Sequence, residues 1–328
     1  MNTHINLDKI KGTPIFKALS RLSVLLILFI ILAFTTHNFI KASNLSTILL
    51  QVAVYAVIAY GVTFVLIVGA TDLSAGSVVG LAGIVTALLL RDYNVSPIVA
   101  ILAGLATGLL CGFINGICVT YLKIMPFIAT LGTSWIFRGF CQLIGDGQPV
   151  TIRSSTSPEA AEFLKTLGSG RIGGFPIAAI VFLVLAVVLS ILLTKTVLGR
   201  NVFATGSNEE AARLSGINVR RTTICAFMLC DVMAALGGVL ITARLSSGQI
   251  AAGTGYELEG IAAAVIGGVS LMGGEGSIAG ALIGALIMGM LRNGLNLNGI
   301  NSYWQQIVIG TILIFAVAFD LFQRRKNK

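Results

Sequence analysis

The sequence predicts an all-α, polytopic helical membrane protein with about ten transmembrane helices, some of them broken into half-helices. Three observations predict this class: of the 328 residues, 56% are hydrophobic, only 11% are charged, and 38 are glycines. A water-exposed surface on a chain of this length needs many charged residues, whereas a lipid-facing surface must be apolar. Because lipid offers no hydrogen-bond partners, the backbone must pair internally, which favours helices.

Apolar segments mark the expected spans, because about 20 such residues cross the hydrocarbon core as a helix. The segments are residues 22–39, 48–68, 74–90, 96–121, 126–143, 176–194, 222–242, 259–272, 277–292 and 303–321. Glycine-rich breaks at IVGATDLSAGS and GGVSLMGGEGSIAG predict half-helices in the third, eighth and ninth segments. The two breaks lie in corresponding positions of the two halves of the chain, which suggests an internal duplication.

The basic residues predict the orientation. With the N-terminus inside, about twice as many Lys and Arg residues fall in cytoplasmic segments as in external ones, the bias typical of membrane proteins. The external set consists of Lys41, Arg91, Arg153, Lys165, Arg171, Arg244 and Arg292. The first apolar segment follows basic residues but lacks an A-x-A cleavage pattern, so we expect a retained helix rather than a signal peptide. Both termini are therefore expected in the cytoplasm.

Two polar segments connect the spans, residues 144–175 outside and about 195–221 inside, and no boundary divides the single transmembrane domain of residues 1–328. The excess of basic residues, 22 against 13 acidic ones, is explained by orientation and does not require a nucleic-acid partner. Two histidines and five cysteines without CxxC spacing give no metal, haem or disulfide pattern. No catalytic constellation is visible, so the sequence does not predict an enzyme.

Glycine and aspartate mark structural positions within the spans. Gly104, Gly108 and Gly112, followed by Gly116, recur every four residues and predict a ridge where another helix packs closely, with a direct role toward substrate as the alternative. Asp72, with Ser74, is expected to cap the next half-helix and hold the break in shape. For Asp231, a pairing with Arg138 is left open.

One polar stretch, NEEAARLSGINVRR, interrupts the apolar pattern at residues 208–221. Asn208 is a plausible N-cap for a short helix that begins at Glu209, and Gly216 is a natural stop. A solvated loop helix is the plain interpretation, because acids at its start and Arg213 farther along suit the helix dipole.

The same stretch resembles a known signature. Glu210, Ala211 and Ala212, followed after Arg213 and two further residues by Gly216, reproduce EAA---G, the cytoplasmic loop of permease subunits of ATP-binding-cassette importers. The resemblance implies that this loop helix lies in a groove of an ATPase subunit and passes its motion to the membrane helices. The longer family form continues toward I-LP, but no proline follows Gly216 here, so the far edge of that contact is not predicted.

Six further stretches in order resemble the ribose-type monosaccharide permeases of the branched-chain amino acid/ribose permease superfamily. They are GATDLSAGS, PFIATLGT, LGRNVFATGSNEEAARLSGINV, ARLSSGQIAAGTGYELEGIAAAVIGG, SLMGGEGS and NGLNLNGINSYWQ. The resemblance implies a bacterial inner-membrane complex of two permease copies, as a homodimer, with cytoplasmic ATP-binding subunits and an external sugar-binding protein. Since the chain has no phosphate loop and no Gly-Lys pair, ATP and Mg²⁺ are expected on the partner.

A monosaccharide path needs uncharged polar groups and aromatic faces. The candidates within spans are Asn115, Phe127, Thr130, Thr133 and Ser134, for which bonding to their own backbone or simple packing is the alternative. Glu257 and Glu259, at the outer end of a span, are expected either to receive the binding protein or to form a solvated rim.

One competing function remains, a gradient-driven secondary sugar transporter in which Asp231 or Asp72 titrates. The EAA---G loop favours the importer, because a gradient-driven carrier has no ATPase to engage.

Overall fold

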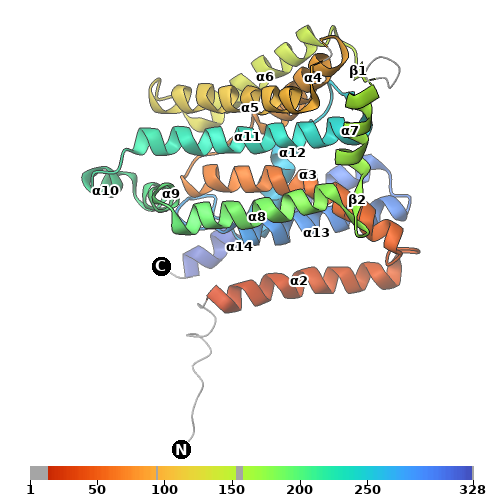
Figure 1. Cartoon of the computed structure of the whole chain (residues 1–328). Helices are drawn as coiled ribbons and strands as arrows, with labels where there is room; N and C mark the ends of the chain where they lie inside the picture. The colour runs from red at the N-terminus through yellow and green to blue at the C-terminus, as the bar shows by residue number, and fades with distance from the viewer. Residues whose placement is uncertain (1–13, 94, 153–157, 327–328) are drawn as a thin grey trace, which may run out of the picture.

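The computed structural model describes residues 14–93, 95–152 and 158–326, and within them the chain is an all-α membrane protein (Figure 1). Its helices are α2 (Pro14–Thr35), α3 (Ala42–Ile67), α4 (Ala75–Arg91), α5 (Pro97–Thr120), α6 (Pro126–Ile144), α7 (Pro158–Ser169), α8 (Ile177–Lys195), α9 (Val197–Ser207), α10 (Glu209–Leu214), α11 (Val219–Leu245), α12 (Tyr256–Ile266), α13 (Ile278–Leu297) and α14 (Ser302–Lys326). Two short antiparallel pairs join β1 (Val150–Thr151) to β4 (Ser247–Gly248) and β2 (Arg171–Ile172) to β3 (Phe175–Pro176).

Each of the ten predicted apolar segments overlaps one of these helices. Among the described residues, six helices are long and apolar enough to cross a membrane: α3, α5, α6, α8, α11 and α13. α4 and α12 are shorter, as expected of half-helices. α12 ends at Ile266 rather than near residue 272, because Gly267 and Gly268 turn the chain and Gly268 adopts a φ of +81°.

α3 and α11 form the centre of the bundle (Figure 1). α3 is buried over most of its length, and α11 packs against α3, α4 and α5. By contrast, α5, α6 and α8 expose many Leu, Ile, Val and Phe side chains on their outer faces. Apolar residues on an outer surface fit a lipid environment, where every backbone group is already bonded inside its helix.

The glycine ridge of α5 packs directly on α11, as the sequence predicts. A Cβ on Gly108 would lie less than 3 Å from the backbone of Asp231, and one on Gly112 would lie 2.5 Å from the Cα of Met228. Gly104 faces Thr86 of α4 in the same way. Only glycine leaves room for such close backbones, so the interpretation as a packing surface is confirmed.

α4 and α12 both begin inside the bundle, after stretches without helix at residues 68–74 and 249–255. The stretch 249–255 touches the start of α4, since a Cβ on Gly253 would collide with the carbonyl of Gly76, and the predicted second break, without helix at residues 267–277, meets the first where a Cβ on Gly273 would lie 3.0 Å from the Cα of Gly69. Non-helical backbone inside a bilayer is tolerated only where protein covers it. Here α5, α6 and α11 cover the first break.

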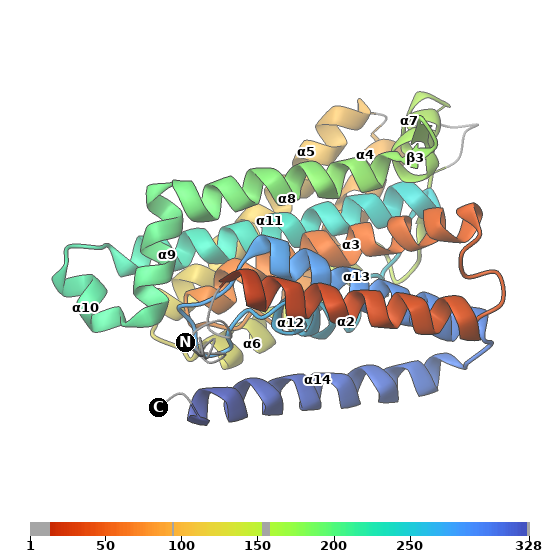
Figure 2. The same cartoon turned by 90° about the horizontal axis from the view of Figure 1, so that it is seen from below.

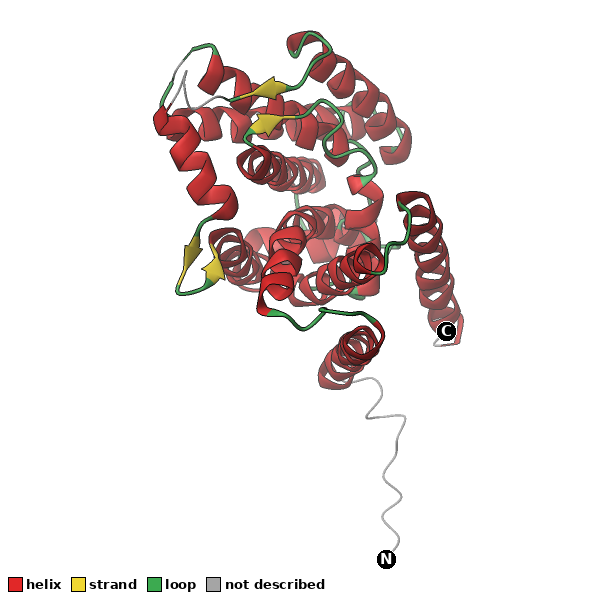
Figure 3. Cartoon of the chain, turned by 90° about the vertical axis from the view of Figure 1, so that its right-hand side faces the viewer, coloured by secondary structure: helices red, strands yellow, loops and turns green. Residues whose placement is uncertain are grey.

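The two ends of the bundle differ. The start of α2, the pair α9 and α10, and the end of α14 lie at one end, which the sequence assigns to the cytoplasm (Figure 1). α7 and the short strands lie at the other end. Figures 2 and 3 show α14 along one side of the bundle, where it contacts α12 and α13. The basic residues Lys9, Lys11, Arg153 and Lys328, used for the predicted orientation, lie outside the described residues.

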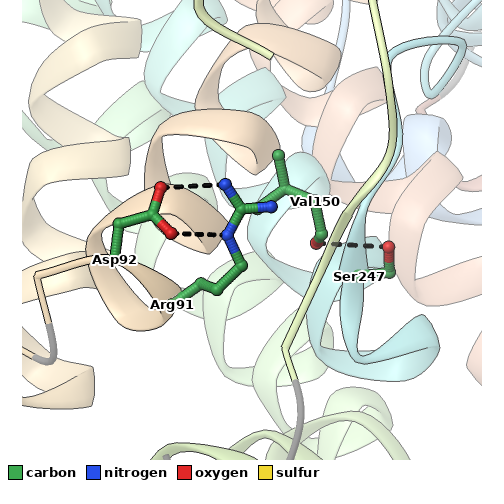
Figure 4. A network of polar contacts seen from close by, with 4 residues as sticks. All are labelled: Arg91, Asp92, Val150 and Ser247. Atoms are coloured by element: carbon green, nitrogen blue, oxygen red, sulfur yellow. Dashed lines mark hydrogen bonds and ion pairs between the residues drawn. The ribbon is translucent and has the colours of Figure 1, made fainter. Parts of the chain in front are cut away.

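Polar contacts secure the external end (Figure 4). The Ser247 hydroxyl donates to the Val150 carbonyl at 3.2 Å, which ties the segment after α6 to the end of α11. Arg91 donates two hydrogen bonds, of 2.6 and 2.8 Å, to Asp92, and they lower the pKa of that exposed carboxyl. One predicted external residue differs: Arg292 lies inside α13, because that helix runs five residues past the expected end, to Leu297.

Candidate functional site

α10 begins and ends where the sequence predicts. The Asn208 side chain accepts a hydrogen bond of 2.9 Å from the backbone N–H of Ala211 and so caps the helix start. Gly216 follows the helix with a φ of +83°, a left-handed conformation that glycine adopts without steric penalty. Its N–H donates to the carbonyl of Arg213 at 3.0 Å. The EAA---G stretch is therefore a short, capped helix.

Most of α10 faces solvent. Ala212 packs inward, whereas Glu210, Ala211 and Arg213 are exposed and the Leu214 side chain is 83% exposed. No atom outside its immediate chain neighbours lies within 4 Å of where Gly216 would carry a Cβ. Packing within the described chain therefore accounts for Ala212 but not for the exposed Ala211, and the face that carries Ala211 and Gly216 is open to a partner.

A groove of about 590 Å³ separates α10 from the ends of the membrane helices. One wall is formed by α10 and the start of α11, through Glu209, Arg213 and Ile217–Arg220. The opposite wall is the junction of α5 and α6, with Thr120, Lys123 and Pro126, and the floor includes the end of α3. A shift of α10 would therefore bear on several membrane helices at once.

A second candidate site is a buried polar network between α5, α6, α11 and the break before α4. Asn115 lies at its centre and donates to the Asp231 carboxylate at 2.9 Å and to the Ser74 hydroxyl at 2.7 Å. It accepts from the Thr133 hydroxyl at 2.6 Å. Because these side chains come from four elements, the network fixes the broken segment to the helices around it.

Asp72 bonds to the residue at which α4 begins. Its carboxylate accepts from the backbone N–H of Ser74 at 2.8 Å and from the Ser74 hydroxyl at 2.7 Å. Ser74 is the N-cap residue of α4, yet its side chain makes no capping bond to the amides of that helix. Ser74 has helical dihedral angles and its carbonyl accepts from the N–H of Val78, so the bond from its own N–H to Asp72 agrees with the expected role of Asp72 at the start of α4.

Among the described residues, one group of three has the spacing of a metal site, namely Asp72, Cys230 and Asp231, whose ligand atoms lie within 4.8 Å of one another. All three are buried. One oxygen of each carboxylate is already bonded within the chain, to Ser74 or to Asn115. The remaining two oxygens have no partner. Because hydrogen bonds already occupy half of its carboxylate oxygens, we assign the group to the structural network.

Four of the five predicted path residues lie near one another. Asn115 and Thr133 are in the network, the Thr130 hydroxyl accepts from the backbone N–H of Leu73 at 3.1 Å, and Ser134 bonds to Ser77 at 2.8 Å. Each of these contacts is made within one chain, so a role in a sugar path stays a prediction. Phe127 is separate from them, since its side chain is exposed on the outer face of α6.

Arg138 does not pair with Asp231. Its guanidinium donates to the carbonyls of Ile250 at 2.5 Å, Ala252 at 2.9 Å and Gly76 at 3.2 Å. The carbonyls of Ile250 and Ala252 lack helical partners because they lie in the stretch without helix before α12, whereas Gly76 lies in the first turn of α4. Arg138 therefore does not form the pair with Asp231 that the sequence left open. Instead it joins α6 to the start of α4 and to the segment before α12.

The expected rim position is wrong for Glu259. Its side chain is buried, and it forms an ion pair with Arg292 at 3.0 Å. The Tyr55 hydroxyl also accepts a hydrogen bond from Arg292, so the charge pair links α3, α12 and α13. Glu257 is half-buried beside Gly76 at the start of α4. A binding-protein contact through Glu259 is therefore excluded by its burial, and for Glu257 it stays a prediction.

The contacts of Arg292 with Glu259 and Tyr55 were not predicted from the sequence. The signal available was an arginine at the edge of an apolar span, which was assigned to the external surface. Only the true end of α13 reveals that this arginine lies beside α12, where a partly buried cation is stabilised by an anion.

Comparison with known proteins agrees with this architecture. A family described as branched-chain amino acid transport system / permease component matches residues 44–317. The ribose import permease protein of Bacillus subtilis is 41% identical over 296 residues, which cover 90% of each chain. Its counterpart from Escherichia coli K12 is 42% identical over 299 residues, 91% of this chain and 92% of the relative.

A relative that is named for a different sugar is nearly as similar. The galactose/methyl galactoside import permease protein of Haemophilus influenzae is 38% identical over 338 residues, 98% of this chain and 99% of the relative. No solved structure matches the chain significantly. These relatives are all named as sugar import permeases, but some are named for ribose and one for galactose.

Proposed function

Because the chain belongs to the branched-chain amino acid transport system / permease component family, we propose that it is the membrane-spanning permease of an ATP-driven monosaccharide importer. It is a transport subunit rather than an enzyme, and a multi-pass protein of the bacterial cell membrane. Two copies enclose the sugar path, ATP-binding subunits hold ATP and Mg²⁺ in the cytoplasm, and an external binding protein delivers the sugar.

The observation that carries the proposal is the capped, exposed α10 helix at one end of the bundle. It presents Glu210, Ala211 and Gly216 to solvent, and it directly precedes α11, the helix that carries Asp231 and packs on α3, α4 and α5. A push on α10 is thereby transmitted to the centre of the bundle through covalent continuity and packing. This is the arrangement that coupling to an ATPase requires.

The substrate is a neutral sugar, of which ribose is the first candidate. The polar groups near the middle of the bundle are amides and hydroxyls, such as Asn115, Thr133 and Ser134, and these suit sugar hydroxyls better than ions. The carboxylates of Asp72 and Asp231 are buried in the network and serve its structure. Galactose is the second candidate, because relatives named for ribose and for galactose are both similar over nearly the whole chain.

Uptake of labelled ribose tests the proposal in cells that make the permease with its ATP-binding and sugar-binding partners. We expect uptake to stop when ATP is depleted at a maintained proton gradient, and to persist with a protonophore at maintained ATP. Unlabelled galactose and other sugars as competitors rank the substrates. Loss of uptake only with the protonophore would overturn the proposal in favour of a gradient-driven transporter.

A further inference from the structure

The turn between α5 and α6, residues 121–125, is apolar and exposed at the same end of the bundle as α10. Tyr121 is 60% exposed, Leu122 64% and Met125 67%. The turn is held in one shape by hydrogen bonds back to α5, from the N–H of Leu122 to Ile117 and from that of Ile124 to Cys118. Solvent exposure of large apolar side chains on an ordered turn marks a surface that something covers.

The backbone of this turn is strained. Lys123 has a φ of +54°, a left-handed conformation that is unfavourable for a non-glycine residue. The surrounding hydrogen bonds maintain this conformation and direct the neighbouring side chains outward. A left-handed residue with such bonds back to the helix is a common way for a helix to end, so Lys123 marks the end of α5 and gives the turn a defined shape.

The turn and α10 lie beside one groove. Lys123 and Arg213 line the same groove of about 590 Å³. Arg220, from the start of α11, lies over the ring of Tyr121, with its guanidinium carbon 5.2 Å from the ring centre. The turn and α10 therefore border one groove, and each carries exposed apolar side chains, Leu122 and Met125 on the turn and Leu214 on α10.

The charges around this surface indicate its partner. Lys123, Arg213, Arg220 and Arg221 are basic, whereas Glu209 and Glu210 are the acidic residues beside them. A partner with an apolar contact flanked by acidic groups complements such a surface. Lipid tails would complement the apolar residues but not the groove with its charged walls.

We propose that the 121–125 turn is a second docking site for the ATP-binding subunit, which contacts this turn and α10 together. The inference rests on the proposed function and deepens it, because it assigns to the partner an apolar surface with acidic flanks that spans the groove. The ATPase then bears on α5 and α6 directly, and not only on α10 and α11.

Photo-crosslinking in the assembled transporter tests the site. A photoreactive amino acid is placed at Leu122, at Leu214, or at Ile172, which is 62% exposed in the external hairpin and serves as the control. We expect adducts with the ATP-binding subunit from Leu122 and Leu214 and none from Ile172.

An adduct from Leu214 alone would overturn this inference and leave the proposed function standing. Adducts from Leu122 with lipid only, or with a second permease copy only, would also overturn it. If neither Leu122 nor Leu214 crosslinks to the ATP-binding subunit, the proposal that α10 couples the permease to an ATPase is itself contradicted.

Substitutions supply an independent measurement. Leu122→Asp and Lys123→Glu should each weaken association of the purified permease with the ATP-binding subunit by about tenfold or more, as expected at the centre of an interface. Lys123→Arg keeps the charge and the backbone conformation, and Ile172→Asp adds the same charge at the far end. Both controls should bind as the unsubstituted chain does. Equal binding by Leu122→Asp and Ile172→Asp would refute the second docking site.

Discussion

The carboxylates of Asp72 and Asp231 lie within 4.8 Å of each other although no ionised partner contacts either one in the described residues. Both side chains are fully buried. Two negative charges at this separation in an apolar interior repel strongly, so one shared proton between the two unbonded oxygens is the arrangement that satisfies both groups. The pair joins the break before α4 to α11, the helix that follows the α10 loop.

Asp231→Asn tests this relationship. An amide has the shape of a carboxyl group, and its NH₂ can donate to Asp72 while its oxygen still accepts from Asn115. We expect full ATP-driven uptake and an unchanged or higher melting temperature in detergent. Asp231→Ala is the matched variant, and it should be less stable by about 1–3 kcal/mol because it leaves a buried donor unpaired. Loss of uptake in a folded Asp231→Asn protein would instead favour the gradient-driven transporter.

Gly108→Leu should prevent close packing of α5 on α11. A Cβ at this position already collides with the backbone of Asp231, so the helices must separate. We expect the yield of monodisperse protein from membranes to fall severalfold, as measured by size-exclusion chromatography. Gly139→Leu is the control, because no atom outside its immediate neighbours lies within 4 Å of that Cβ position. Similar yields from the two variants would contradict the packing role of the ridge.

Gly216→Val should uncouple transport from ATP hydrolysis. The position has space for a side chain, but its φ of +83° strongly disfavours a β-branched residue, so the chain after α10 must change direction. We expect normal membrane insertion, continued ATP hydrolysis and reduced sugar uptake in reconstituted vesicles. Gly216→Asn should retain most uptake, because asparagine tolerates this conformation. The interpretation fails if the valine and asparagine variants transport equally well.

Glu210→Lys addresses the same contact through charge instead of backbone shape. Glu210 is exposed in the first turn of α10 and forms no ion pair with any residue that the structure describes. We expect unchanged folded yield with reduced stimulation of the ATPase by binding protein and sugar, and Glu210→Gln should have the smaller effect. Full stimulation of the lysine variant would remove Glu210 from the coupling surface.

Removal of one partner of the Glu259 and Arg292 pair should be strongly destabilising. Arg292→Met leaves the buried Glu259 without its counter-ion, at a penalty of about 3–5 kcal/mol, and Glu259→Gln should cost less because the Arg292 that it leaves unpaired is only partly buried. The double variant should be more stable than the two separate losses predict, which a double-mutant cycle on melting temperatures measures. Additive losses would show that the ion pair contributes no coupling between α12 and α13.

The sequence determined which segments form helices, because that depends on local composition, although it misplaced the ends of α12 and α13. Apolar length set the helices, because a segment such as residues 126–143 can bury its backbone in lipid only as a helix. The capping of α10 by Asn208 and its end at Gly216 were also predictable, since both depend on residues within one turn. The four-residue spacing predicted the ridge of α5, though not that α11 is the helix it meets.

The tertiary structure decided which distant residues meet. Arg138, Asp231 and Arg292 are each costly to bury, so the sequence shows that each needs a partner but not which one. The answer depends on how α4, α11, α12 and α13 are placed. Arg138 bonds to carbonyls at the start of α4 and before α12, Asp231 meets Asn115 and Asp72, and Arg292 meets Glu259. Side chains far apart in the sequence are paired by helix packing, which is a property of the whole fold rather than of any segment.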